Sequence, residues 1–168
     1  MKVEYIDHMG TDLTVVNAAR VSFDKTSDWN HWRDTEDDGI VKKYLKDKDT
    51  KLIKYLAKHN HWTPFGHCQA TLRIKAPIFV ARQLGKHQTG MVWNEVSRRY
   101  VDNPPEFYNP QYWRGKAENA KQGSSSEVID YVIKPAYAYA LECYTNMITS
   151  GVCPEQARMV LPQSMYTE

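Results

Sequence analysis

The densest group of side chains that could carry out chemistry lies between Ala81 and Tyr100, in the sequence ARQLGKHQTGMVWNEVSRRY. Cations and amides occur there together with the Ser97 hydroxyl and one carboxylate: Arg82, Gln83, Lys86, His87, Gln88, Asn94, Glu95, Ser97, Arg98 and Arg99. Cations beside a carboxylate and a hydroxyl could bind an anionic group together with a heterocycle. A solvated charged helix followed by a surface turn is the alternative, and the residues alone do not separate the two.

The first half of this stretch is predicted to be a helix. Pro77 suits the first turn because its backbone angle is already helical. Gln83, Lys86 and His87 then follow at i, i+3 and i+4, so they share one polar stripe. Gly85 and Thr89-Gly90 weaken the helix and predict its end, so the polar residues from Asn94 onward fall in a loop.

Composition and net charge argue against several classes of function. The 168 residues carry a net charge of +2 and are 42% hydrophobic, which suits one domain over 1–168 with a real core and does not favour a nucleic-acid or membrane partner. The three cysteines have no C-x-x-C spacing, which favours a reducing compartment. The N-terminus has no signal-peptide pattern, and no apolar run approaches the ~20 residues of a membrane helix. We therefore expect a soluble, cytoplasmic protein.

Hydrophobic periodicity and capping residues predict the elements of the first half of the chain. They are a strand at 2–7, a helix from Thr11 or Asp12 to about Val21, helices at 38–46 and 50–60, and a strand at 67–76. Residues 24–39 are polar and are expected to form a surface loop or a lid.

The second half is predicted to be irregular first and helical afterwards. Residues 103–115 hold three prolines and should follow the surface. Ser124 and Glu127 have the spacing of a capping box, so we expect a helix from there towards Ser150, with Pro135 kinking it. Gly151 suits the position after that helix, and a short helix should begin at Pro154.

Three further clusters invite a chemical interpretation. His59, His61, His67 and Cys68 lack the spacing of a zinc site, so we expect no metal; packing or capping, or a cofactor contact through His61 and Thr63, remain open.

Cys153 before Pro154 is interpreted as a helix N-cap with a buried thiol rather than a nucleophile. Ser97 lacks the glycine-flanked elbow of serine hydrolases, so beside two arginines it suits phosphate binding. Arg158 is a candidate for either a buried ion pair or a phosphate clamp.

Several motifs in order resemble the flavin-dependent thymidylate synthases (ThyX). These are HNHWTPFGH, KAPIFVARQ, KHQ with NEVSRRY, EFY and ARMVLP, and the similarity runs from AARVSFD at 18–24 to LPQSMYT at 161–167. The resemblance implies that dUMP is methylated to dTMP, with methylenetetrahydrofolate as carbon donor and NADPH reducing a bound FAD. It also implies an α/β (α+β) fold, a twisted and mostly antiparallel sheet flanked by helices, in a homotetramer.

The resemblance assigns roles by position. The implied catalytic residues are Ser97, Glu95 and His87. The implied cofactor-binding residues are His61, Thr63, Lys86, His87, Gln88 and Glu95. The implied dUMP-binding residues are Gln83, Lys86, Glu95, Val96, Ser97, Arg98, Arg99 and Arg158.

Two departures from the family pattern stand out. Lys86-His87-Gln88 replaces the Arg-His-Arg signature, with eight residues before Ser97 instead of seven, and we expect the extra residue in a bulge at Gly90–Trp93. The chain also ends at Glu168 where family members continue. An alternative function is therefore a non-catalytic FAD- and dUMP-binding fragment that works with a C-terminal fragment in trans. A nucleic-acid-binding module that uses Arg98, Arg99 and the aromatic residues of 107–113 is a third interpretation.

Overall fold

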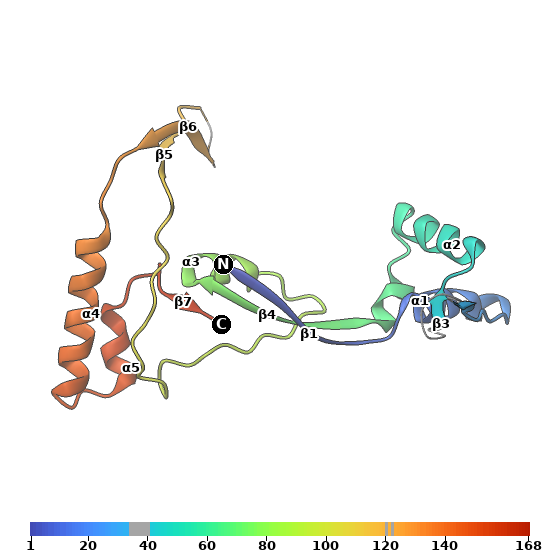
Figure 1. Cartoon of the computed structure of the whole chain (residues 1–168), viewed down its shortest axis with the longest axis horizontal. Helices are drawn as coiled ribbons and strands as arrows, with labels where there is room; N and C mark the ends of the chain where they lie inside the picture. The colour runs from blue at the N-terminus through green and yellow to red at the C-terminus, as the bar shows by residue number, and fades with distance from the viewer. Residues whose placement is uncertain (34–40, 120, 122) are drawn as a thin grey trace. The chain divides into compact units, whose positions relative to one another are not determined.

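The first compact part of the chain is built on two helices, α1 (Asp12–Arg20) and α2 (Asp47–Lys58). The computed structural model describes residues 1–33, 41–119, 121 and 123–168. Within it the chain divides into two compact units: unit 1 comprises Met1–Val3 and Ile74–Glu168, and unit 2 comprises Glu4–Arg73 (Figure 1). The single domain expected over 1–168 stays a prediction.

In unit 2, the sequence signals for α1 and α2 correspond to the observed helices. Thr11 is the N-cap of α1, and its backbone N–H donates to Thr14 Oγ1 at 3.0 Å. Val15 and Val16 are buried on α1, as Leu56 is on α2, because the apolar residues recur at helical spacing. The chain leaves α1 through η1 (Val21–Phe23) and leaves α2 towards η2 (Thr63–His67).

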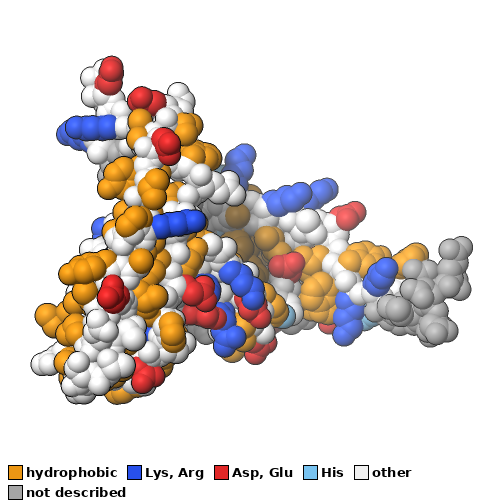
Figure 2. Space-filling model, turned by 60° about the vertical axis from the view of Figure 1, so that its left-hand side comes forward, with side chains coloured by type: hydrophobic (Ala, Val, Ile, Leu, Met, Phe, Trp, Pro, Cys, Tyr) orange, Lys and Arg blue, Asp and Glu red, His pale blue; other side chains and the backbone are white. Residues whose placement is uncertain are grey.

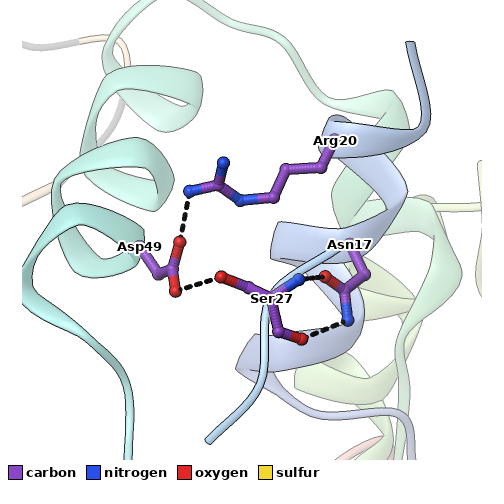
Figure 3. A network of polar contacts seen from close by, with 4 residues as sticks. All are labelled: Asn17, Arg20, Ser27 and Asp49. Carbon is purple, nitrogen blue, oxygen red and sulfur yellow. Dashed lines mark hydrogen bonds and ion pairs between the residues drawn. The ribbon is translucent and has the colours of Figure 1, made fainter. Parts of the chain in front are cut away.

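A buried polar network joins α1, α2 and the segment between them (Figure 3). Asp49 has no exposed surface and accepts hydrogen bonds from Ser27 Oγ, at 2.6 Å, and from the Arg20 guanidinium. Asn17 closes the network: its Oδ1 accepts the Ser27 N–H at 2.7 Å, and its Nδ2 donates to the Ser27 carbonyl at 3.1 Å. These bonds satisfy polar groups whose burial would otherwise be costly.

A two-stranded antiparallel pair replaces part of the expected loop and part of the expected helix at 38–46. Strands β2 (Asn30–Arg33) and β3 (Val41–Tyr44) pair with Asn30 opposite Tyr44 and Trp32 opposite Lys42. The Lys42 ammonium lies 5.9 Å from the centre of the Trp32 ring, a cross-strand contact that periodicity along one segment does not reveal. The parts of both predictions that fall at 34–40 lie outside the described residues.

A three-stranded sheet of order β1-β4-β7 contains β1 (Lys2–Met9), β4 (Gln69–Pro77) and β7 (Tyr166–Thr167). The β4–β7 pairing is antiparallel, with Ala76 opposite Thr167. The predictions of strands at 2–7 and 67–76 are thus confirmed, as is the α/β (α+β) fold of antiparallel strands with helices. The helix predicted after this strand is also observed as α3 (Ile78–Leu84), but Pro77 is its N-cap, with an extended backbone, and not part of the first turn.

After a long segment without helices or named strands, unit 1 continues with a hairpin followed by two helices. Strand β5 (Trp113–Lys116) pairs antiparallel with β6 (Ser124–Ile129), and helix α4 (Lys134–Thr149) lies beside α5 (Pro154–Ala157) and η3 (Arg158–Val160) (Figure 1). Tyr144 and Ala157 are buried in this helical part. Among the described helices, none has the length and apolar character to cross a lipid bilayer.

The predicted helix start at Ser124 is wrong. Ser124 and Glu127 belong to β6, where the backbone is paired with β5 and not with a helical turn. The helix begins instead at Lys134, so Pro135 lies in its first turn and produces no kink, as the missing N–H of proline permits.

The end of this helix and the start of the next follow the local signals. Gly151 follows the α4 C-cap, Ser150, with a φ of +86°, as expected. Cys153 is the N-cap of α5, as predicted, but it is exposed and not buried.

Candidate functional site

A cavity of about 800 Å³ lies in unit 1. Three segments that are distant in sequence line it: Ile78 and Arg82 on α3; Glu95, Val96, Ser97, Arg98 and Arg99; and Glu155, Arg158, Met159, Leu161, Gln163, Met165 and Thr167. The loop that the sequence singled out thus forms one wall. The region around α5, η3 and β7 forms another.

The β7 wall is tied to α3 by backbone hydrogen bonds. The N–H of Ile78 donates to the Met165 carbonyl at 2.9 Å, and that of Phe79 donates to the Gln163 carbonyl at 3.1 Å. Met165 and Thr167 alternate along an extended segment, so both face the cavity. Gln163 also lines the cavity, from the turn in which the N–H of Met165 donates to the Pro162 carbonyl at 2.9 Å. Ile78 and Arg82 are one helical turn apart on α3, which explains why both reach it.

The loop segment is docked against β7 by one side-chain bond and one main-chain bond. Thr167 Oγ1 donates to Glu95 Oε1 at 2.6 Å. The N–H of Val96 donates to the carbonyl of Glu168 at 2.9 Å. Beyond Val96 the chain turns, because the N–H of Tyr100 donates to the Ser97 carbonyl at 3.0 Å. The Ser97 hydroxyl and the Glu95 carboxylate therefore line one cavity.

Hydrogen bonds already orient three of the four arginines in the cavity. Arg99 Nε donates to Ser97 Oγ at 3.2 Å, and its guanidinium lies 5.0 Å from the centre of the Tyr100 ring. Arg98 donates to the backbone carbonyl and the side chain of Asn103. Arg158 Nε donates to the Glu155 carbonyl at 3.1 Å.

Arg82 differs from these three. Among the residues that the structure describes, the Arg82 guanidinium has no hydrogen-bond or ion-pair partner, so all its donors are open to a ligand. With two carboxylates facing four guanidinium groups, the cavity is strongly cationic. An arginine fork is the side chain that best matches a phosphate, so the arrangement suits an anionic ligand.

The structure rules out one of the two roles considered for Arg158. The side chain is exposed to the cavity, and it forms no ion pair with a described carboxylate. The interpretation as a buried ion-pair partner is therefore wrong, and the phosphate-clamp interpretation stays as a proposal.

The lysine-histidine-glutamine part of the signature is not in the cavity lining. Helix α3 ends at Leu84, so Lys86 and His87 lie beyond it and the predicted helical stripe of Gln83, Lys86 and His87 is not formed. Lys86 Nζ still donates to Gln83 Oε1 at 3.0 Å. The N–H of His87 donates to the Leu84 carbonyl at 2.9 Å. These residues and Gln88 are exposed and follow directly from the helix that carries Arg82.

Residues Gly90–Trp93 form the loop in which the extra residue was expected. The Trp93 indole N–H donates to the His87 carbonyl at 3.2 Å, and the N–H of Met91 donates to the Gln88 carbonyl at 3.2 Å. Gly90 has a φ of +72°, a backbone conformation that favours glycine. The loop is therefore held closed on the segment that carries the signature.

His61 and Thr63, the other two expected cofactor residues, belong to unit 2. The His61 ring forms an aromatic cluster at the end of α2 with Tyr55, 6.0 Å away, and with His59. The Tyr55 and His59 rings are 4.4 Å apart. In the described part of the chain, no three His, Cys, Asp or Glu side chains are grouped so as to hold a metal ion.

Sequence reasoning missed several residues of the cavity. Arg82 stands among the charged residues of the central stretch but has no assigned role in the predicted site, and Glu155, Gln163, Met165 and Thr167 are absent from that site altogether. A usable signal existed for Glu155, which is three residues before Arg158 in a helix. None existed for Thr167, because its position depends on a strand pairing distant in sequence.

The fold and this cavity define an α/β protein with a cationic ligand site. Residues 4–168 match the family model described as thymidylate synthase complementing protein, Thy1. The chain belongs to this family, which confirms the resemblance to the flavin-dependent thymidylate synthases.

Curated relatives carry the name flavin-dependent thymidylate synthase. One from Thermus thermophilus is 37% identical over 99% of this chain and 57% of its own length. One from Thermotoga neapolitana is 38% identical over 98% of this chain and 67% of its own length. The chain thus spans between about half and two thirds of these relatives.

A solved structure with a similar fold is the UMP/dUMP methylase PolB from Streptomyces cacaoi, bound with 5-Br dUMP. It has a TM-score of 0.72 and 33% sequence identity, and the match covers 99% of this chain and 69% of PolB. A second PolB structure, bound with 5-Br UMP, has a TM-score of 0.70.

Proposed function

We propose that this chain provides the nucleotide-binding part of a flavin-dependent thymidylate synthase, which converts dUMP to dTMP. The observation that carries the proposal is the cavity where four arginines and the Ser97 hydroxyl converge. Family membership and the 5-Br dUMP bound by the similar protein PolB support it.

The phosphate of dUMP is bound by arginines and a hydroxyl. Arg82 offers unoccupied donors, and Arg99 and Arg158 each use only Nε in the hydrogen bonds described above, which leaves their terminal nitrogens for the ligand. Ser97 Oγ accepts from Arg99 and so can direct its own proton to a phosphate oxygen. Ser97 then acts as a phosphate ligand and not as a nucleophile.

The uracil and the sugar occupy the rest of the cavity. Ile78, Met159, Leu161 and Met165 supply apolar surface for a flat ring. Glu95 has one carboxylate oxygen bonded to Thr167, so the other is available to accept a hydrogen from the nucleotide. The chain's contribution is to fix the ring and the phosphate in one orientation.

The residues after α3 fit an anionic, ring-bearing cofactor such as FAD. Lys86, His87 and Gln88 present a cation, an imidazole and an amide, all exposed, on a loop that the Trp93 indole holds closed. Lys86 has two N–H donors left beyond its bond to Gln83. When bound, the flavin supplies the hydride chemistry. His61 and Thr63 are proposed as further flavin contacts, with NADPH as reductant and methylenetetrahydrofolate as carbon donor.

Self-association in a homotetramer is part of the proposal. Hydrophobic side chains cover much of the helical part of unit 1, where α4 and α5 lie (Figure 2). On α4, Tyr139 is 70% exposed, and Val132 just before the helix is also 70% exposed. An apolar surface of this kind is typical of subunit contacts.

A second candidate function follows from the length comparison. The chain spans 57% of the length of the Thermus relatives. In this second function it is an FAD- and dUMP-binding subunit that needs a second polypeptide for turnover. We propose the cytoplasm as its location in either case. NADPH oxidation by the 168-residue chain with dUMP, FAD and methylenetetrahydrofolate present separates the two, because only the first function gives turnover.

Calorimetric titration with dUMP and deoxyuridine tests the nucleotide site. We expect Arg99→Ala to weaken dUMP binding roughly 10- to 100-fold, as for loss of a charge-assisted hydrogen bond, and to leave deoxyuridine binding unchanged. Arg114→Ala, on β5 and outside the cavity, is the matched control. Wild-type binding of dUMP no tighter than deoxyuridine would refute the proposed phosphate site. UMP in the same titration measures discrimination at the sugar.

A further inference from the structure

Glu95 is a carboxylate in a cavity with four arginines, yet it forms no ion pair with any of them. Across the described residues, its only hydrogen bond comes from Thr167, whose Oγ1 donates to Glu95 Oε1 at 2.6 Å. A free glutamate has several rotatable bonds and would be expected to swing towards the nearest guanidinium. The short hydrogen bond from Thr167 explains why the Glu95 side chain does not turn towards a guanidinium group.

From this we infer that Thr167 is a positioning residue that holds the Glu95 carboxylate away from the arginines of the cavity. The consequence is twofold. The arginines stay available for the phosphate of the ligand, and the second oxygen of Glu95 stays available for a donor on the nucleotide. This inference rests on the proposed nucleotide site and adds a residue to it.

The backbone around Thr167 is fixed without its hydroxyl. The N–H of Val96 donates to the Glu168 carbonyl at 2.9 Å, and β7 pairs with β4 with Thr167 opposite Ala76. Valine has the shape of threonine and a similar preference for strands. Thr167→Val should therefore keep the fold and remove only the hydrogen bond to Glu95.

Binding of dUMP and of inorganic phosphate reports on these two consequences. In Thr167→Val, the released Glu95 competes for the arginines, so both dUMP and inorganic phosphate should bind roughly three- to tenfold more weakly, as for loss of one hydrogen bond. Thr167→Ser keeps the hydroxyl and should bind both as the wild type does. Thr149→Val, on α4, removes a threonine hydroxyl bonded only to backbone carbonyls, and it is the matched control.

The double variant Glu95→Gln with Thr167→Val distinguishes positioning from a general structural effect. A neutral amide does not compete for guanidinium groups as a carboxylate does, so inorganic phosphate binding should return to the wild-type value. Binding of dUMP should stay weak, because the carboxylate that accepts from the nucleotide is missing. A merely structural role of Thr167 would leave phosphate binding weak in the double variant.

The measurement is calorimetric titration of the 168-residue chain and each variant with dUMP and inorganic phosphate, with circular dichroism to verify folding. Wild-type affinity in Thr167→Val, or no return of phosphate binding in the double variant, would overturn the inference alone. A wild-type chain that does not bind dUMP would overturn the proposed function and the inference together. Thr167→Ala removes the same hydroxyl without keeping a branched side chain, and it must weaken binding of dUMP and inorganic phosphate as Thr167→Val does.

Discussion

Asp49 is the residue of unit 2 whose removal should be most costly. It has no exposed surface, and it is bonded to Ser27 Oγ at 2.6 Å and to the Arg20 guanidinium. Burial by itself would raise the pKa of the Asp49 carboxyl, but the Ser27 hydrogen bond and the Arg20 cation together lower it below its ordinary value. The carboxylate is therefore the charged form that the folded state stabilises.

We expect Asp49→Ala to lower the free energy of unfolding by about 3 kcal/mol. Breaking a buried ion pair typically costs about 3–5 kcal/mol, because the remaining charge is left unpaired. The lower end applies here because the Arg20 side chain is 19% exposed and can be partly hydrated. With an m value of about 2 kcal/mol/M, the urea midpoint should fall by roughly 1.5 M.

Urea denaturation followed by circular dichroism, with hydrogen exchange of the α1 and α2 amides, measures this effect. Asp47→Ala is the matched control, since Asp47 is an exposed aspartate in the same first turn of α2. Removing it should cost about 0.3–1 kcal/mol through the helix dipole. Equal midpoint shifts for the two variants would refute the argument that the buried network stabilises unit 2.

The pH dependence of the stabilisation by Asp49 has a definite sign. Because the folded-state pKa of Asp49 is lowered, its contribution is fully present above the unfolded-state pKa of about 3.9. The contribution is lost as the pH falls through the folded-state value. The stability difference between the wild type and Asp49→Asn should therefore be constant from neutral pH down to about pH 5 and shrink below about pH 4. A difference that grows on acidification would contradict this assignment.

Two further substitutions test local features of unit 2. Asn17→Ala removes both bonds to the Ser27 backbone, 2.7 and 3.1 Å long, and should cost about 1–3 kcal/mol in thermal denaturation; an unchanged melting temperature would count against this anchoring role. Gly10→Ala places a Cβ 2.7 Å from Cys68 Sγ at a φ of +83° and should destabilise by more than about 1 kcal/mol. Gly66→Ala, where a Cβ has open space, is the control and should be nearly neutral.

The sequence predicted those elements whose signals are local. Thr11 before α1, Pro77 before α3 and Pro154 at the start of α5 each act within one helical turn, so their effect is visible in the adjacent residues. The wrong predictions at 30–33, 41–44 and 124–129 all fall on strands of two-stranded pairs. A strand needs a partner, and the partner is not specified by the pattern of the segment itself.

The candidate site likewise contains residues that the sequence predicts and residues that only the tertiary structure brings in. Residues Glu95–Arg99 could be selected from sequence because a hydroxyl, a carboxylate and two arginines within five positions must lie close together. Family membership could also be predicted from sequence, because it depends on the order of motifs along the chain.

Only the tertiary structure decided which other groups meet that segment. The pairing of β7 with β4 brings Thr167 to Glu95 across 72 positions of sequence, and α3 and η3 bring Arg82 and Arg158 to the same cavity. Residue types and short spacings determine the local conformation and the chemical groups that a segment offers. Strand pairing and helix packing determine which distant side chains share one site, because those contacts depend on how the whole backbone satisfies its hydrogen bonds and buries its apolar surface.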